Sequence, residues 1–129
     1  MRILIYGAGV IGSLYASLFS EAGIDTTVYA RGRRLESLRQ NGLRYEKNGK
    51  IQTASVRVLD ALAKDDIYDF IFVPVRENQL HEALTQLRDN QSPHIVTMVN
   101  SLEDYCLWEQ LCGTGRIIPA FPGAGGGFE

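Results

Sequence analysis

The sequence predicts an α/β fold with a doubly wound, mostly parallel sheet of six strands in the order 3-2-1-4-5-6, together with an inserted β-hairpin. Short apolar segments bounded by glycine alternate along the chain with segments whose apolar residues recur at helical spacing. Helical connections between parallel strands cross over in the right-handed sense, which places helices on both faces of the sheet. The 129 residues, 45% hydrophobic and 22% charged, suit one soluble domain with a single core.

The chain opens with a β-α-β-α alternation. Arg2–Tyr6 is a short apolar run typical of a buried parallel strand, and a twelve-residue helix follows it and ends before Gly23. Thr26–Ala30 is β-branched and aromatic, as in a second strand, and the next helix ends at Asn41-Gly42. The apolar positions of the first helix are Ile11, Leu14, Tyr15, Leu18, Phe19 and Ala22, and those of the second are Leu35 and Leu38.

A β-hairpin interrupts this alternation. Asn48-Gly49 lies between two alternating stretches, Leu43–Lys47 and Lys50–Val58, as in a two-residue type I′ turn. Such a turn pairs Leu43 with Ala54. We expect the inner arm of the hairpin to be the third strand of the main sheet.

The alternation resumes after a polar link at 60–66. Apolar runs at 69–75, 94–99 and 116–121 predict the fourth, fifth and sixth strands. Because proline cannot donate a ladder hydrogen bond, we place Pro74 at the carboxyl end of the fourth strand, where pairing finishes. Of the two helices between these strands, the first carries Leu80, Ala83, Leu84 and Leu87, and the second has Ser101 and Asp104 spaced as in a capping box and ends at Gly113.

Charge and composition exclude several classes of function. Thirteen Lys and Arg against fifteen Asp and Glu give a net charge of −2, too balanced for a nucleic-acid binder or a polybasic membrane anchor. The two cysteines and two histidines form no zinc pattern, so no metal site is expected. Glycines break the apolar stretch Met1–Ser20, and other apolar runs fall short of the ~20 residues that cross a bilayer. We therefore expect a cytoplasmic protein that binds neither nucleic acid nor membrane.

Gly7-Ala8-Gly9-Val10-Ile11-Gly12 fits the pattern G-x-G-x-x-G between the first predicted strand and the first predicted helix. In dinucleotide-binding turns the first glycine permits the tight turn, the second lets a pyrophosphate approach the backbone, and the third lets the helix pack against the strand. The phosphates then bind free N–H groups at the positive end of the helix. The alternative is a turn that holds nothing, but the surrounding βαβ unit favours nucleotide binding.

The end of the second predicted strand indicates which dinucleotide binds. An acidic residue at that place binds the ribose 2′-hydroxyl of NAD, but the sequence here is Ala30-Arg31-Gly32-Arg33-Arg34, with no acid before Glu36. A guanidinium suits a phosphate, so the sequence favours NADP with Arg31 as the principal ligand of the 2′-phosphate. The alternative is a solvated helix start, although three cations oppose the dipole of the helix that follows.

The sequence resembles the ketopantoate reductase (2-dehydropantoate 2-reductase) family, on the residues RILIYGAGVIGSLYA, YARGRRLESLRQNGLR and VPVRENQL. The resemblance covers nearly the whole chain. It implies an NADPH-dependent reduction of a 2-oxo acid to a 2-hydroxy acid on the route to pantothenate. By position, it also implies that Gln79 lies near the cofactor ribose, that Asn100 lies near the nicotinamide and the substrate, and that Arg76 stands where the family usually has a cofactor-site lysine.

Further departures from the family pattern leave the identity of the 2-oxo acid open. The family commonly continues Gly-Leu-Gly after its asparagine, whereas Ser101-Leu102-Glu103 follows here and brings an acid close to the expected substrate site. The ending PAFPGAGGGFE also differs from the family. The roles of Arg76, Glu103 and the Gly123–Gly127 run stay open.

Four other residues have ordinary structural interpretations. His81 falls on the polar side of its helix and is expected to face solvent rather than act as a base. Cys106 and Cys112 are expected to be core thiols on an apolar stripe with Trp108, which is itself expected in the core.

These observations predict a dinucleotide-binding domain over residues 1–122 and, at 123–129, a glycine-rich tail that links it to a missing C-terminal helical domain. The resemblance implies that this second domain supplies the catalytic lysine, so the fragment alone is expected to be inactive. Two alternatives stay open, a stand-alone NADP-responsive module and the cofactor domain of another NADP-dependent dehydrogenase. The oligomeric state is also open, with a homodimer as one alternative.

Overall fold

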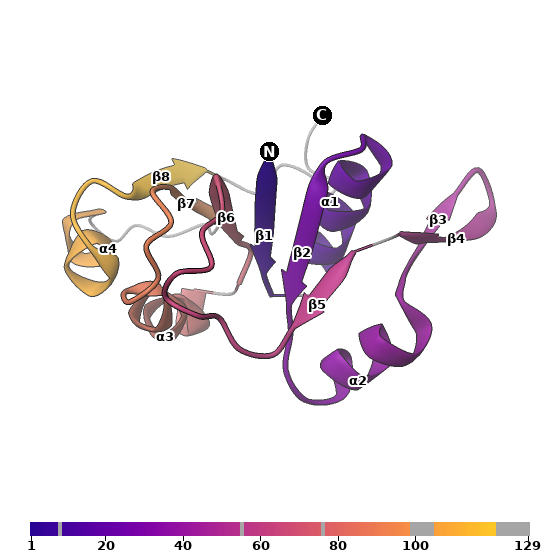
Figure 1. Cartoon of the computed structure of the whole chain (residues 1–129), viewed down its shortest axis with the longest axis horizontal. Helices are drawn as coiled ribbons and strands as arrows, with labels where there is room; N and C mark the ends of the chain where they lie inside the picture. Colours follow the sequence, from indigo (N-terminus) through magenta and orange to yellow (C-terminus); the bar gives the residue numbers. More distant parts are fainter. Residues whose placement is uncertain (8, 55, 76, 99–104, 121–129) are drawn as a thin grey trace.

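The computed structural model describes residues 1–7, 9–54, 56–75, 77–98 and 105–120 and contains a six-stranded sheet in which all neighbouring strands are parallel (Figure 1). The spatial order is β5-β2-β1-β6-β7-β8. Counted along the chain within this sheet, the order is 3-2-1-4-5-6, as the sequence predicts. The strands are β1 (Arg2–Tyr6), β2 (Asp25–Tyr29), β5 (Arg57–Leu59), β6 (Phe70–Val73), β7 (Ile95–Met98) and β8 (Ile117–Ala120).

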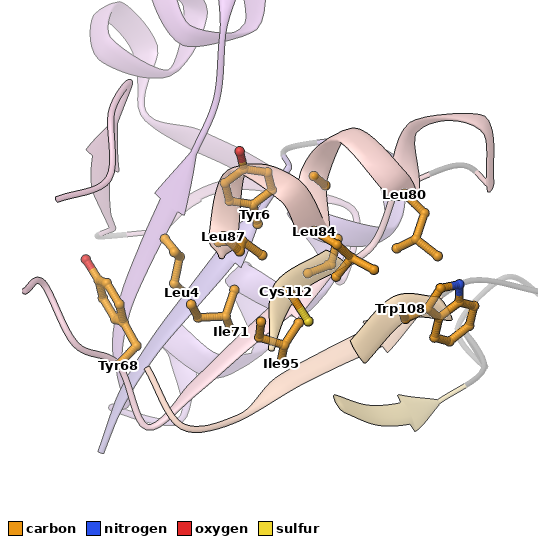
Figure 2. Close-up of a cluster of buried hydrophobic side chains, with 12 residues drawn as sticks. Leu4, Tyr6, Tyr68, Ile71, Leu80, Leu84, Leu87, Ile95, Trp108 and Cys112 are labelled. Atoms are coloured by element: carbon orange, nitrogen blue, oxygen red, sulfur yellow. The ribbon is translucent and has the colours of Figure 1, made fainter. Parts of the chain in front are cut away.

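Helices cover both faces of the sheet, and the alternating side chains of β1 divide the core between them. Ile3 and Ile5 pack with residues of α1 (Val10–Glu21) and α2 (Gly32–Asn41). Leu4 and Tyr6 point to the opposite face, where residues of α3 (Glu77–Leu87) and α4 (Tyr105–Cys112) cover them (Figure 2). The buried side chains contributed by these two helices are Leu80, Ala83, Leu84, Leu87, Trp108 and Cys112.

Most element boundaries confirm the sequence prediction to within a residue or two. Gly23 and Gly42 follow α1 and α2 with positive φ values of 83° and 74°. Pro74 lies just beyond β6, which ends at Val73, so its missing donor removes no ladder hydrogen bond. The predicted capping box at Ser101 and Asp104 and the tail at 123–129 lie outside the described residues.

The hairpin departs from the prediction. Leu43 pairs with Ala54, and Asn48 and Gly49 both have positive φ, as a type I′ turn requires. However, β3 (Leu43–Lys47) and β4 (Lys50–Ala54) form a sheet of their own, which stands apart from the main sheet in Figure 1. The inner arm of the hairpin is therefore not the third strand, as we expected.

The third strand of the main sheet is the short β5, which follows the hairpin. Its Val58 pairs with Val28 of β2 and packs against the core, whereas β4 is exposed at every position except Ala54. The alternation of 50–58 thus belongs to two strands with different partners. At the base of the hairpin, Leu43 and Ala54 are buried in the core beside α1, and the partly buried Tyr45 packs against it.

The two cysteines differ in burial, so the prediction that both are core thiols is confirmed for Cys112 and wrong for Cys106. Trp108 and Cys112 are four residues apart on α4 and are both buried, as predicted. Cys106 is exposed. It precedes Trp108 by two positions, which places it roughly 200° around the helix from the buried stripe.

Arg116 connects the ends of α3 and α4 just before β8. Burial lowers the pKa of its guanidinium, which still donates four hydrogen bonds to backbone carbonyl oxygens at 2.6–3.2 Å. These carbonyls belong to Leu87, Asn90, Ser92 and Cys112. Because two of them end helices, the cation meets the negative ends of both helix dipoles.

Among the described helices, none has the length and apolar character needed to cross a membrane.

Candidate functional site

The turn between β1 and α1 lies at the carboxyl edge of the sheet, beside the point where the strand order reverses between β1 and β6. Gly7 has a φ of +129°, which an L-residue rarely adopts, and its N–H donates to the carbonyl of Tyr29 at 3.1 Å. A Cβ on Gly7 would also lie 3.3 Å from Cγ1 of Val75. The first glycine of the motif therefore has the tight-turn role that the sequence predicts.

Gly12 lets α1 approach this turn closely. A Cβ at this position would lie 2.1 Å from the carbonyl oxygen of Gly7 and 3.1 Å from Cγ of Pro74. Real Cβ atoms essentially never come within 3.0 Å of a backbone atom. The third glycine is thus required where the first turn of α1 meets the end of β1 and the residue after β6.

Gly9 faces open space. It is exposed, and a Cβ built on it would meet no atom of the structure within 4 Å. It is the N-cap of α1 and makes no side-chain capping bond, and the first turn of the helix has no acidic residue. The first N–H groups of a helix lack intrahelical partners, so this end of α1 presents donors and a positive dipole to an anion. The turn therefore fits a pyrophosphate, with room at Gly9 for it to approach.

Arg31 lies at the second predicted position, immediately after β2. It is the N-cap of α2, and the N–H of the preceding Ala30 donates to the carbonyl of Leu59 at 3.0 Å, which fixes the end of β2 against β5. Its side chain is 63% exposed and reaches α3, where Nη1 lies 3.5 Å from Oε1 of Glu82. A ligand from solvent can therefore reach the guanidinium.

The other two arginines of this segment are placed differently. Arg34 is half-buried and its Nη2 donates to Oγ of Ser13 at 2.8 Å, which ties α2 to the first turn of α1. Arg33 is exposed. The interpretation of these arginines as a solvated helix start therefore fits Arg33 better than the other two.

One polar face of α3 lies opposite Arg31. Gln79, Glu82 and Gln86 are spaced by three and four residues, which places them on the same side of the helix. Gln86 Nε2 donates to Glu82 Oε1 at 3.3 Å. This face therefore continues from the predicted cofactor residue Gln79, which is exposed in the first turn of α3, to the carboxylate beside Arg31.

A pair of tyrosines anchors this face to the sheet. Tyr6 and Tyr29 end neighbouring strands, and their rings stack in parallel with centroids 4.3 Å apart. Burial, together with the neighbouring Tyr29, raises the pKa of Tyr6, so its hydroxyl keeps its proton and donates to Oε1 of Gln86. Gln86 thus accepts a hydrogen bond from a residue of the sheet and donates one to Glu82.

The structure brings together part of the predicted site. Gly7, Gly9 and Gly12 form one turn, with Val10 and Ile11 in the first turn of α1. Ala8, Arg76, Asn100 and Glu103 lie outside the described residues. His81 is exposed on α3, as predicted.

The sequence analysis missed Glu82, Gln86 and the tyrosine pair. The spacing of Gln79, Glu82 and Gln86 was the available signal, because a side chain predicted to face the cofactor implies that residues three and seven positions later share its face. The link from Glu82 to Arg31 joins residues 51 positions apart and depends on the fold.

Comparison with known proteins gives a consistent result. A family model described as "Ketopantoate reductase PanE/ApbA" matches residues 3–125. A 2-dehydropantoate 2-reductase of Mesorhizobium japonicum is 33% identical over 105 residues, which are 79% of this chain and 32% of that protein. Its counterpart from Pyrococcus horikoshii is 35% identical over 91 residues, which are 69% of this chain and 29% of that protein.

A solved structure shares the fold. The putative 2-dehydropantoate 2-reductase from Enterococcus faecalis superposes with a TM-score of 0.80 at 21% identity, over 94% of this chain and 41% of that chain. The chain thus spans about a third of the length of the curated relatives that it matches, 32% and 29%.

Proposed function

Because this chain belongs to the ketopantoate reductase family, we propose that it is the NADPH-binding domain of an oxidoreductase that reduces a 2-oxo acid to a 2-hydroxy acid. The observation that carries this proposal is the pairing of an open glycine turn at the start of α1 with an accessible arginine at the end of β2. The turn can hold a pyrophosphate, and the guanidinium can hold a 2′-phosphate.

Each group of the chain has a separate binding role in this proposal. The first-turn N–H groups of α1 donate to the pyrophosphate, and Gly9 keeps the space in front of them free of side-chain atoms. Arg31 gives the 2′-phosphate a permanently charged planar donor. Gln79, on the exposed face of α3, hydrogen-bonds a ribose hydroxyl in this proposal. These contacts bind and orient the dinucleotide before any chemistry takes place.

The reaction divides between two domains. Bound NADPH supplies the hydride that reduces the substrate carbonyl. Asn100 orients the substrate and the nicotinamide, but an amide cannot supply the proton that the developing alkoxide needs. Following what the family resemblance implies, we assign that step to a lysine in a second, helical domain, which would follow residues 1–122 and the linker at 123–129.

Replacing Arg31 by Ala tests the cofactor assignment. The 2′-phosphate loses a charge-assisted contact worth roughly 1.5–3 kcal/mol, so the Kd for NADPH should rise about 10- to 150-fold. The Kd for NADH should stay almost unchanged, because NADH has no 2′-phosphate. Both constants can be measured by calorimetric titration.

Arg39→Ala is the matched control for this experiment. Arg39 is an exposed arginine at the far end of α2 that pairs with Asp60 at 3.6 Å, so its removal changes the net charge equally. It should leave both Kd values within about twofold, because exposed charges beyond a Debye length are screened. An equal loss of NADPH and NADH binding in Arg31→Ala would contradict the role of Arg31.

Catalysis gives a separate prediction. The 129-residue chain should bind NADPH but should not oxidise it measurably with ketopantoate or other short 2-oxo acids, because the proton donor lies in the second domain. The loss of NADPH absorbance at saturating substrate measures this directly. Sustained turnover by the isolated chain would show that it contains the complete catalytic site.

A further inference from the structure

A carboxylate lies beside the guanidinium that the proposed function assigns to the 2′-phosphate. Oε1 of Glu82 is 3.5 Å from Nη1 of Arg31, and both side chains are more than 60% exposed, at 64% and 63%. Their interaction joins the end of β2 to α3 across the carboxyl edge of the sheet. A ligand that approaches Arg31 therefore meets Glu82 as well.

Glu82 has a second hydrogen-bond partner besides Arg31, on its own helix. Its Oε1 accepts a hydrogen bond from Nε2 of Gln86 at 3.3 Å, and Gln86 in turn accepts from the hydroxyl of Tyr6. Tyr6 is 6% exposed and stacks on Tyr29. The carboxylate is thus linked through one side chain to a buried residue of the central strand.

This carboxylate would affect the two nicotinamide cofactors in opposite ways. A 2′-phosphate carries nearly two negative charges and must compete with Glu82 for Arg31, which lowers the gain from phosphate binding. An unphosphorylated ribose has a 2′-hydroxyl, which can donate a hydrogen bond to a carboxylate oxygen. Dinucleotide-binding domains that prefer NAD place an acid at the end of the second strand for this purpose. In this chain the acid comes from α3 instead.

We infer that Glu82 is a specificity-determining residue that weakens the preference of this domain for the 2′-phosphorylated cofactor and keeps NADH binding measurable. The inference rests on the proposed function, because it assigns the adenosine end of the cofactor to the space between Arg31 and α3. It concerns a residue that neither the glycine motif nor the arginine segment contains.

The test is Glu82→Gln, which keeps the size and the acceptor oxygen of the side chain and removes its charge. We expect the ratio of the Kd for NADH to the Kd for NADPH to rise about fivefold, the upper effect of one exposed ion pair. Calorimetric titration of both cofactors with the wild-type chain and the variant gives this ratio. Asp89→Asn is the matched control, because it removes an exposed carboxylate just beyond the C-terminal end of α3.

The outcomes separate this inference from the proposed function. If the wild-type chain binds neither cofactor, the proposed function is overturned, and the inference is overturned with it. If the wild-type chain binds NADPH but the ratio stays within about twofold in Glu82→Gln, the inference alone is overturned. An equal rise of the ratio in Asp89→Asn would reduce the effect to net charge and would also overturn it.

Discussion

Replacing Gly9 by Val is expected to abolish the binding of both NADPH and NADH while the domain stays folded. The backbone of Gly9 has a φ of −73°, which valine can adopt, and a Cβ there would meet no atom within 4 Å. The isopropyl group would instead fill the space proposed for the pyrophosphate, which both cofactors share. We expect at least a 100-fold loss of affinity, about 2.7 kcal/mol or more, because several charge-assisted hydrogen bonds are lost together.

The fold of this variant can be checked separately. Valine is a poorer N-cap than glycine, so the free energy of unfolding should fall by about 1 kcal/mol, with the circular dichroism spectrum unchanged. The measurement is a calorimetric titration of the folded variant with each cofactor. Titration curves that match those of the wild-type chain would show that the turn at Gly9 does not hold phosphates.

Replacing Arg116 by Met is expected to cause a large loss of stability. Arg116 lies at the ends of α3 and α4, away from the glycine turn. Methionine keeps much of the apolar stem but leaves four carbonyl groups without their donor. At roughly 0.5–1.5 kcal/mol for each hydrogen bond, the free energy of unfolding should fall by about 3 kcal/mol. Denaturation in urea gives this difference, when both proteins are fitted with one common slope of the free energy of unfolding against urea concentration.

Arg88→Met is the matched control, because Arg88 is an exposed arginine just after α3. Surface substitutions usually change the free energy of unfolding by less than about 0.5 kcal/mol. If Arg116→Met lost no more than this control, the hydrogen bonds of Arg116 to the ends of α3 and α4 would not contribute measurably to stability.

Much of the fold could be predicted from local sequence because local rules and tertiary structure agree. The apolar run Arg2–Tyr6, the helix that ends before Gly23 and the Asn48-Gly49 turn each have one favoured conformation, and the structure has that conformation at each place. The match of a family model to residues 3–125 likewise confirms the resemblance first drawn from short motifs.

The third strand could not be predicted, because no local pattern marks where the hairpin arm ends and a strand of the main sheet begins. We predicted one alternating stretch over 50–58, yet Lys50–Ala54 pairs with β3 and Arg57–Leu59 pairs with β2. Most of β4 is exposed, so the polarity of its residues does not indicate a buried face: even the apolar Ile51 is 67% exposed. The sequence pattern identified the pairing of the two hairpin arms but not the separate strand β5 that pairs with β2.

The candidate site was predictable in part for a similar reason. The glycine turn is a local structure, so its three glycines could be assigned from spacing and are found where the spacing places them. Arg31 could be placed at the end of β2. Its neighbour Glu82 could not, because their contact depends on how α3 crosses the sheet. In our proposal, the cofactor preference of the domain therefore depends on a tertiary contact and not on the arginine segment alone.

A nuclear magnetic resonance titration of the 15N-labelled chain with NADPH tests the central claim most directly, because it reports which backbone N–H groups meet the ligand. The account predicts saturable shifts of the amide signals of Gly7, Gly9 and Ser13 and of Arg31, with smaller changes at the amino edge of the sheet around Asp66. Saturable shifts confined to other parts of the chain, or no shifts at millimolar NADPH, would contradict it.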